Sequence, residues 1–327
     1  MEFDEHPAGR REAMIQLLRL GGVSAAAVGL GVWLNDRSHK PAEPAAPAVR
    51  RNFQVPANAA LPEMVVIQGD DPALLARRAI QELGGIRRFI ARGDVVVIKP
   101  NAAWDRTPEQ AANTNPLVVG EVCRLCLEAG ARRVIVTDVS INDPRRVFAR
   151  SGIGAAARAA GAEVLLPDER LFREVDLRGQ VLNVWPVLEP FLTAGKLINI
   201  PIAKHHSLTG ATLGMKNWYG ILGGPRQALH QRIHESLADL ADFMRPTLTL
   251  IDAFRVLLRN GPGGGDLADV AWKRTLLAGT DPVALDAYAA KAWWNLDWHK
   301  LRYLQLASER QLGTLNFEAV RTRFVTL

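Results

Sequence analysis

Cysteine is scarce in this chain, which has only Cys123 and Cys126 among its 327 residues. Two thiols exclude a self-contained iron–sulfur site built from four cysteines, and they exclude a disulfide scaffold. Both lie within VVGEVCRLCLEAG, which has helical periodicity, whereas a redox CxxC pair normally lies at the start of a helix. We therefore predict that they are two small core residues on a helix face. A bridge between them in an oxidising compartment is the alternative.

Several familiar signatures are also absent. The formal net charge of +6 comes without a long Lys/Arg run and without alternating basic and aromatic residues, so we do not expect nucleic acid as a partner. The sequence has no P-loop, no HExxH motif and no nucleophile elbow. A mildly basic chain of this kind fits a locally basic pocket for an anionic ligand.

The N-terminal region reads as a targeting segment. Arg10 and Arg11 precede a Gly/Ala-rich apolar stretch that ends at Leu34 and is short for a membrane-spanning helix. This pattern resembles a twin-arginine export signal. We predict a signal or anchor over residues 1–40 and a Pro/Ala-rich linker over residues 41–61. The protein is then exported, either free in the periplasm or tethered to the membrane facing it.

Residues 62–327 contain no further clear linker and predict a single α/β domain. Apolar runs alternate with helical patterns, which predicts a mainly parallel sheet flanked by helices. A short alternating stretch over residues 173–187 predicts a β-hairpin insertion. The expected strands are 64–68, 94–99, 133–137, 162–166, 247–252 and 273–279, and the expected helices are 72–91, 151–160, 230–244, 282–294 and one that begins at Pro116.

Polar side chains follow several of these strands. The apolar run that begins at Leu197 stops at Lys204-His205-His206, and other strands end at Lys99 and Asn101, at Asp138 and at Asp252. In an open parallel sheet the C-terminal ends of the strands line one crevice. We therefore expect these residues to converge in a single site.

Three kinds of chemistry remain open for this site. The first is a divalent metal held by imidazole and carboxylate groups. His230 and His234 are spaced four residues apart and are expected to share a helix face. The metal ligands that this hypothesis predicts are His205, His206, His230, Asp138 and Asp252.

The second kind is an anion site, and the third is acid/base catalysis. Lysines, Arg226 and the backbone N–H groups of the glycine-rich loop 261–265 could hold a phosphate or a carboxylate. Alternatively His205 or His206 acts with Asp252 as a catalytic group. Adjacent histidines in a strand point to opposite faces, so only one of the two is expected to be the base.

Three joined motifs support a shared site. VVVIKPNAAW, KLINIPIAKHHSLTGATLGMKNWYGIL and LTLIDAFRVLLRNGPGGGDLADVAWKRTLLAGTDPVALDAYAA together resemble the bacterial and archaeal family called domain of unknown function 362, from about Met64 to about Trp294. Some members carry ferredoxin-like cysteine motifs, which this chain lacks. The positions that match the family's motifs are Lys99, Asn101, Lys204, His205, Thr209, Lys216, Asn217, Asp252, Gly261, Pro262, Asp281 and Asp286.

These observations lead to one functional hypothesis and one alternative. The hypothesis is an exported α/β protein that binds an anionic small molecule, a metal or both in a crevice, as an enzyme of unidentified reaction. The alternative is a non-catalytic metal- or ligand-binding accessory protein that partners an iron–sulfur or redox protein. The predicted ligand-binding residues are Lys99, Asn101, Lys204, Thr209, Lys216, Asn217, Gly261, Gly263 and Asp281.

Overall fold

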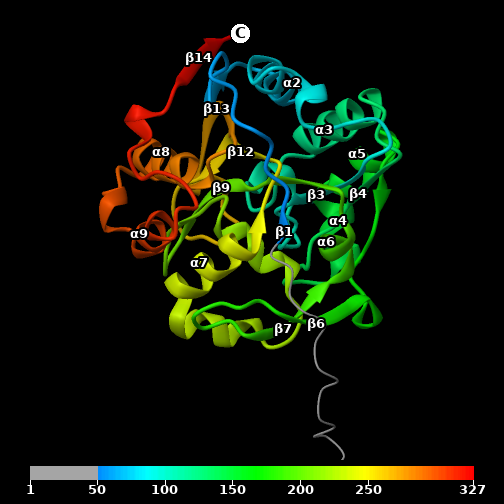
Figure 1. Ribbon diagram of the computed structural model, residues 1–327, viewed down its shortest axis with the longest axis vertical. Helices are drawn as coiled ribbons and strands as arrows, with labels where there is room; N and C mark the ends of the chain where they lie inside the picture. The colour runs from blue at the N-terminus through cyan, green and yellow to red at the C-terminus, as the bar shows by residue number, and fades with distance from the viewer. Residues whose placement is uncertain (1–50) are drawn as a thin grey trace, which may run out of the picture. The chain divides into compact units, whose positions relative to one another are not determined.

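The computed structural model describes residues 51–327, all of which lie in one compact unit (Figure 1). The predicted signal and most of the predicted linker lie outside the described residues. Within this part of the chain, no helix is both long enough and apolar enough to span a membrane.

A ten-stranded sheet forms the centre of the molecule (Figure 1). Parallel pairing dominates, because only the pairs β2–β13, β13–β12 and β9–β10 are antiparallel. This confirms the predicted mainly parallel α/β sheet. The main path of the sheet runs β14 (Thr322–Thr326), β2 (Met64–Gln68), β13 (Val270–Gly279), β12 (Leu248–Leu257), β8 (Lys196–Ile200), β3 (Val95–Pro100), β4 (Arg133–Val136) and β5 (Glu163–Val164), while β9 (Ile202–His206) pairs with β12 and with β10 (Gly210–Thr212).

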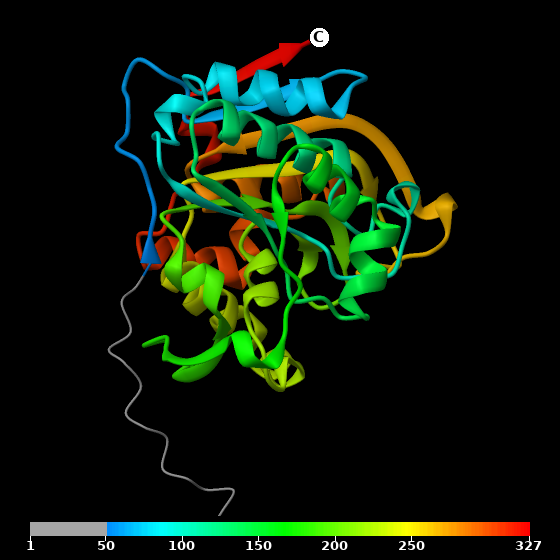
Figure 2. The ribbon, with the colours of Figure 1, turned by 90° about the vertical axis from the view of Figure 1, so that its right-hand side faces the viewer.

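Helices cover both faces of this sheet, as Figure 2 shows with α2 and α3 on one side and α7 to α9 on the other. Consecutive strand residues point to opposite faces, so Val96 and Ile98 pack in the first layer and Val97 packs in the second. The helices of the first layer are α2 (Pro72–Glu82), α3 (Pro116–Glu128), α4 (Pro144–Arg150) and α5 (Ile153–Ala159), and those of the second are α6 (Glu189–Thr193), α7 (Ile233–Phe243), α8 (Pro282–Trp294) and α9 (Arg302–Glu309).

The cysteines and the helix starts agree with the sequence patterns. Cys123 and Cys126 are free, buried side chains of α3, as predicted for core residues. Asp71 and Asp281 accept hydrogen bonds from the first backbone N–H groups of α2 and α8, and proline occupies the first turn of both helices.

Some predicted boundaries are wrong. The helix expected over residues 72–91 ends at Glu82, because Gly84 and Gly85 adopt positive φ angles that break it. The helix expected over 151–160 begins at Ile153 and is preceded by the separate helix α4. Short 3-10 helices fill several connections: η1 (Ile86–Arg88), η2 (Pro108–Gln110), η3 (Glu169–Leu171), η4 (Lys216–Ile221), η5 (Arg226–Arg232), η6 (Leu267–Asp269), η7 (Trp298–Lys300) and η8 (Phe317–Ala319).

Two small sheets lie apart from the main one. The predicted hairpin is present as antiparallel β6 (Phe172–Asp176) and β7 (Val184–Leu188). Its turn is held by Asp239 of α7, whose carboxylate accepts backbone N–H bonds from Gln180, Val181 and Leu182. The second small sheet joins β1 (Arg51–Asn52) to β11 (Met244–Arg245) in parallel.

Candidate functional site

A pocket of about 290 Å³ opens beyond the C-terminal ends of β3 and β4. Strand β9 and the 3-10 helices η4 and η5 supply the rest of its wall. Among residues 51–327, Asp138 is the only acidic residue in this lining. The residues that line the pocket are Lys99, Asn101, Ala103, Trp104, Asp138, Val139, Ile141, Lys204, His206, Thr212, Lys216, Asn217, Tyr219, Gly220, Arg226, Gln227, His230 and Pro262.

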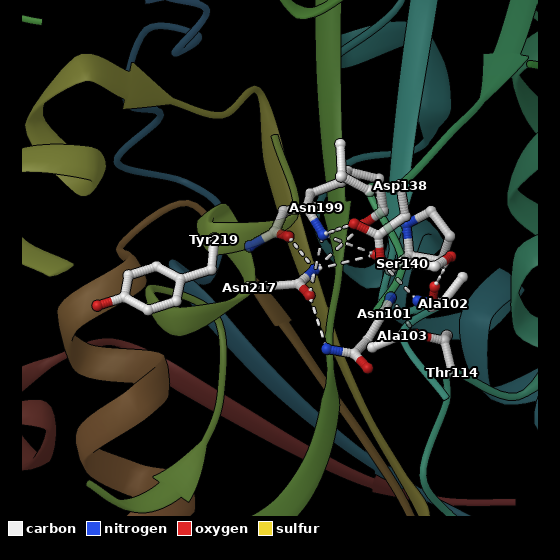
Figure 3. A network of polar contacts seen from close by, with 12 residues as sticks. Asn101, Ala102, Ala103, Thr114, Asp138, Ser140, Asn199, Asn217 and Tyr219 are labelled. Atoms are coloured by element: carbon white, nitrogen blue, oxygen red, sulfur yellow. Dashed lines mark hydrogen bonds and ion pairs between the residues drawn. The ribbon is translucent and has the colours of Figure 1, made fainter. Parts of the chain in front are cut away.

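Lys99 and Asp138 form a buried ion pair at the base of the pocket. The Lys99 ammonium lies 2.7 Å from Asp138 Oδ1. The other oxygen of the Asp138 carboxylate accepts the Ala102 N–H at 2.6 Å (Figure 3). Burial lowers the pKa of Lys99, and the charge of Asp138 acts in the opposite direction. Both oxygens of this carboxylate are therefore already engaged within the protein.

Asn217 connects the polar groups of three elements (Figure 3). Its side-chain oxygen accepts hydrogen bonds from Lys99 Nζ at 3.2 Å and from Asn101 Nδ2 at 3.0 Å. Its amide nitrogen donates to Asn199 Oδ1 on β8 at 2.8 Å. A buried amide satisfied on all these sides holds η4 at a fixed position over β3 and β8.

Lys204 lies on β9 and is fully buried. Its ammonium donates to Asn101 Oδ1 at 3.0 Å and to the Ala112 carbonyl at 2.6 Å. Burial and the neighbouring Lys216 charge lower the pKa of Lys204 to about 7. The Lys204 amine is therefore partly protonated and partly neutral near pH 7.

Lys216, at the start of η4, differs from the other two lysines. Only 8% of it is exposed, and its ammonium lies 4.5 Å from the centroid of the Tyr219 ring. Among residues 51–327 it has no hydrogen bond or ion pair beyond this ring contact. Burial lowers the pKa of Lys216 to about 8. A buried cation that lacks a polar partner and faces a pocket is a candidate ligand-binding group.

His206 and His230 lie together at one side of the pocket. Their rings are nearly parallel, with centroids 6.4 Å apart. His206 Nδ1 accepts the Leu208 N–H at 3.1 Å, so the neutral ring carries its proton on Nε2. His230 Nδ1 lies 3.2 Å from the Gln227 carbonyl, which only accepts, so this ring carries its proton on Nδ1. Burial and the Lys216 charge lower the pKa of both, that of His206 to about 3, and both are neutral at pH 7.

The structure thus brings together all of the predicted lysines and asparagines, and it places His206 rather than His205 in the pocket lining. His205 points to the glycine-rich loop, where its Nδ1 accepts the Gly261 N–H at 3.2 Å. Asp252 does not reach the pocket. The strand that was expected to end at this residue continues to Leu257, and the buried Asp252 accepts N–H bonds from Asn115 and Phe254.

The predicted metal ligands do not form a metal-binding group, although His206, His230 and Asp138 all line the pocket. Across residues 51–327 there is no group of three or more His, Cys, Asp or Glu side chains that could hold a metal ion. The shared helix face expected for His230 and His234 is also wrong, because α7 begins only at Ile233. His230 lies on η5 at the pocket, whereas the His234 ring stacks on Tyr303.

Other predicted ligand-binding residues have local structural partners. The Thr209 hydroxyl donates to the Ala211 carbonyl at 2.9 Å, and the Asp281 carboxylate accepts N–H bonds at the start of α8 and from Thr314. Gly261 and Gly263 flank Pro262, which alone of the three lines the pocket. A Cβ at Gly261 would collide with the His205 carbonyl, so glycine is needed for this close approach.

Sequence reasoning missed Trp104 and Tyr219 as lining residues. Both belong to motifs already singled out, since Trp104 ends VVVIKPNAAW and Tyr219 follows Lys216-Asn217-Trp218. The rule that loops after parallel strands line the site would have identified Trp104. Arg226 was expected to bind an anion, but its guanidinium donates to the Val139 and Ser140 carbonyls at 2.8 Å, which fixes the loop after β4.

Comparisons with known proteins place the chain in a family without an established activity. It is 27% identical over 225 residues to the thylakoid-associated protein sll1697 of Synechocystis sp., a match that covers 64% of this chain and 66% of that relative. The lactate racemase apoprotein from Thermoanaerobacterium thermosaccharolyticum aligns with a TM-score of 0.43 at 11% identity, over 72% of this chain and 58% of that one. A structural-genomics protein from Thermotoga maritima aligns with a TM-score of 0.36 at 13% identity, over 74% and 60%.

The family model described as Domain of unknown function (DUF362) matches residues 96–291, which include every residue lining the pocket and more than half of the chain, and the chain belongs to this family.

Proposed function

We propose that the pocket binds a small anion through a carboxylate or phosphate group. Lys216 is the observation that carries the proposal, because its ammonium is buried, faces the pocket and lacks a polar partner among the described residues. The one carboxylate of the lining is already paired with Lys99. An anion bound in the pocket would supply the negative charge that the Lys216 ammonium lacks as a partner.

Lys204 adds a second cation to the same pocket. Two of its donors are engaged by Asn101 and Ala112, and an ammonium has three. The third N–H is available to a ligand oxygen. Bound between two ammonium groups, an anion would favour the protonated form of both lysines.

Ligand titration with the purified protein tests this proposal. Thermal shift and calorimetry are measured with acetate, benzoate and inorganic phosphate. A ligand at 100 times its Kd stabilises the folded state by about 2.7 kcal/mol, which raises Tm by roughly 5 °C for a domain of this size.

Lys216→Met removes the cation while keeping the apolar stem, and we expect it to abolish the shift. Lys300→Met is the matched control, because that lysine is 84% exposed and lies outside the pocket lining. If no anion shifts Tm of the wild-type protein, or if Lys216→Met binds as tightly as wild type, the proposal is wrong.

Catalysis by proton transfer is a second candidate, favoured by the pKa of about 7 for Lys204. A catalytic acid or base is most effective when its pKa lies near the working pH. The neutral rings of His206 and His230 could relay a proton at the same site. In D₂O, a bound carboxylate should exchange a hydrogen on the carbon next to its carboxylate group for deuterium, and NMR measures this exchange. Lys204→Met should stop it. If the ligand binds but no hydrogen is exchanged, this reaction is excluded and the protein only binds the anion.

We also propose that the chain is exported, on the basis of the Arg10-Arg11 pair and the apolar stretch that follows it. Replacing both arginines with lysine should retain the protein in the cytoplasm of its host. Fractionation that finds this variant in the periplasm would contradict a twin-arginine route.

A further inference from the structure

The pocket has two chemically different ends. Lys99, Lys204 and Asn217 are buried, each no more than 2% exposed. The apolar lining residues are more open to solvent, since Ile141 is 57% exposed and Trp104 is half-buried. The buried polar groups therefore form the floor, and the mouth combines these apolar residues with the exposed polar side chains of Gln227 and His230.

The mouth is assembled from segments far apart in the sequence. Trp104 follows β3, Ile141 follows β4, and Pro262 belongs to the glycine-rich loop. Gly263 packs this loop against the Trp104 ring, because a Cβ at that position would lie 3.3 Å from the ring atoms. Apolar side chains from three segments thus contribute to the entrance above a cationic floor.

We propose that the ligand is an amphipathic organic anion, with its carboxylate or phosphate on Lys204 and Lys216 and its hydrocarbon body against Trp104, Ile141 and Pro262. This inference rests on the anion-binding function proposed above and adds the chemical class of the ligand. An inorganic anion would occupy only the floor and leave the apolar mouth in water. A hydrocarbon body would remove this apolar surface from water, which is favourable.

The size of the pocket limits the ligand further. Ligand sites commonly span ~300–1,000 Å³, so a cavity of about 290 Å³ lies just below that range. The space suits a short aliphatic or single-ring acid rather than a nucleotide-sized cofactor. The asymmetry between mouth and floor also sets the direction of entry, with the charged group first.

A homologous series of anions tests this inference. Calorimetry is run with acetate, propionate, butyrate, pentanoate and benzoate. Butyl phosphate is compared with inorganic phosphate to measure the effect of the hydrocarbon chain, and with pentanoate to distinguish the two head groups. Each methylene group that reaches the mouth should tighten binding about fourfold, the factor that corresponds to about 0.8 kcal/mol per buried CH₂. The tighter binder of two ligands with the same hydrocarbon chain shows whether the pocket prefers a carboxylate or a phosphate group.

Side-chain variants then locate the effect. Trp104→Ala should reduce the gain in affinity per methylene group by at least half. The backbone of Trp104, not its ring, makes the hydrogen bonds to Asn113, so this truncation keeps the loop in place. Ile141→Ala is a second test at an exposed position, and Trp272→Ala, at a 56% exposed tryptophan outside the lining, is the matched control.

The possible outcomes separate the two proposals. Acetate that binds as tightly as pentanoate and benzoate would overturn the amphipathic ligand and leave anion binding intact. A gain with chain length that survives in both Trp104→Ala and Ile141→Ala would also overturn it, because the hydrocarbon would then lie elsewhere. If no member of either series binds, the proposed function itself fails.

Discussion

The pH dependence of anion binding is the sharpest test of the roles proposed for Lys204 and Lys216. Burial lowers the pKa of Lys216 to about 8 and that of Lys204 to about 7, and only the protonated amines attract an anion. Because the anion favours the protonated form of both lysines, its binding takes up protons from solution at any pH where the lysines of the free protein are partly deprotonated. Affinity should therefore fall as pH rises.

The magnitude follows from the protonated fraction of each amine. Between pH 7 and pH 9 this fraction falls about tenfold for Lys216 and about fiftyfold for Lys204, given their pKa values of about 8 and about 7. If both amines must be protonated, affinity drops about 500-fold over this interval. A carboxylate ligand such as benzoate is the right probe because it keeps a single charge over the whole range.

Isothermal titration calorimetry measures this directly. Titrations at pH 7, 8 and 9 in buffers of different ionisation enthalpy give both the affinity and the proton uptake, which should approach about two protons at pH 9. Lys216→Arg isolates one group, because a guanidinium stays charged throughout. The fall in affinity should then shrink to about fiftyfold, the share of Lys204.

Lys300→Arg serves as the control and should keep the full dependence, since that lysine is exposed and outside the lining. Affinity that changes less than threefold between pH 7 and pH 9 would refute the reasoning. A Lys216→Arg variant with an undiminished 500-fold fall would refute the assignment to Lys216.

Three further predictions concern the fold around the pocket. Lys99→Met leaves the buried carboxylate of Asp138 without its cation, so urea unfolding should show a loss of about 3–5 kcal/mol, and an unchanged midpoint would contradict the role of the pair. Gly220→Ala would place a Cβ on the Asp138 carboxylate and 2.6 Å from Lys99 Nζ, so the folded variant should lose ligand-induced stabilisation in a thermal shift assay; retained binding would show that η4 can move away. Cys123 and Cys126 are buried with raised pKa values, so Ellman's reagent should label neither thiol until the protein unfolds, and rapid labelling of native protein would show that α3 opens.

Local sequence patterns predict many of the helices and strands. The buried strands β2, β3 and β4 and the proline-initiated helices α3 and α8 lie close to where apolar runs and capping residues predict them. These elements depend on residues adjacent in sequence, whose propensities agree with their surroundings. The helix predicted over residues 72–91 is too long, because Gly84 and Gly85 adopt positive φ angles and the helix ends at Glu82.

The candidate site was predicted in part. The rule that polar residues follow parallel strands identified Lys99, Asn101, Asp138 and Lys204 as neighbours, and the structure confirms that they line one pocket. The same rule failed for Asp252. Its strand, β12, continues because the antiparallel partner β13 supplies hydrogen bonds as far as Leu257.

What the sequence alone determined is the α/β class of the sheet and the set of cations at its strand ends. The tertiary structure decided which of these groups are free. A sequence lists donors and acceptors, but the partners of Lys99 and Lys204 come from distant segments, Asp138 for Lys99 and Asn101 for Lys204. Within the part of the chain that the structure describes, Lys216 has only the Tyr219 ring. The tertiary structure also decided that His206 rather than His205 lines the pocket, because strand pairing sets which face a side chain occupies, and pairing is a long-range property.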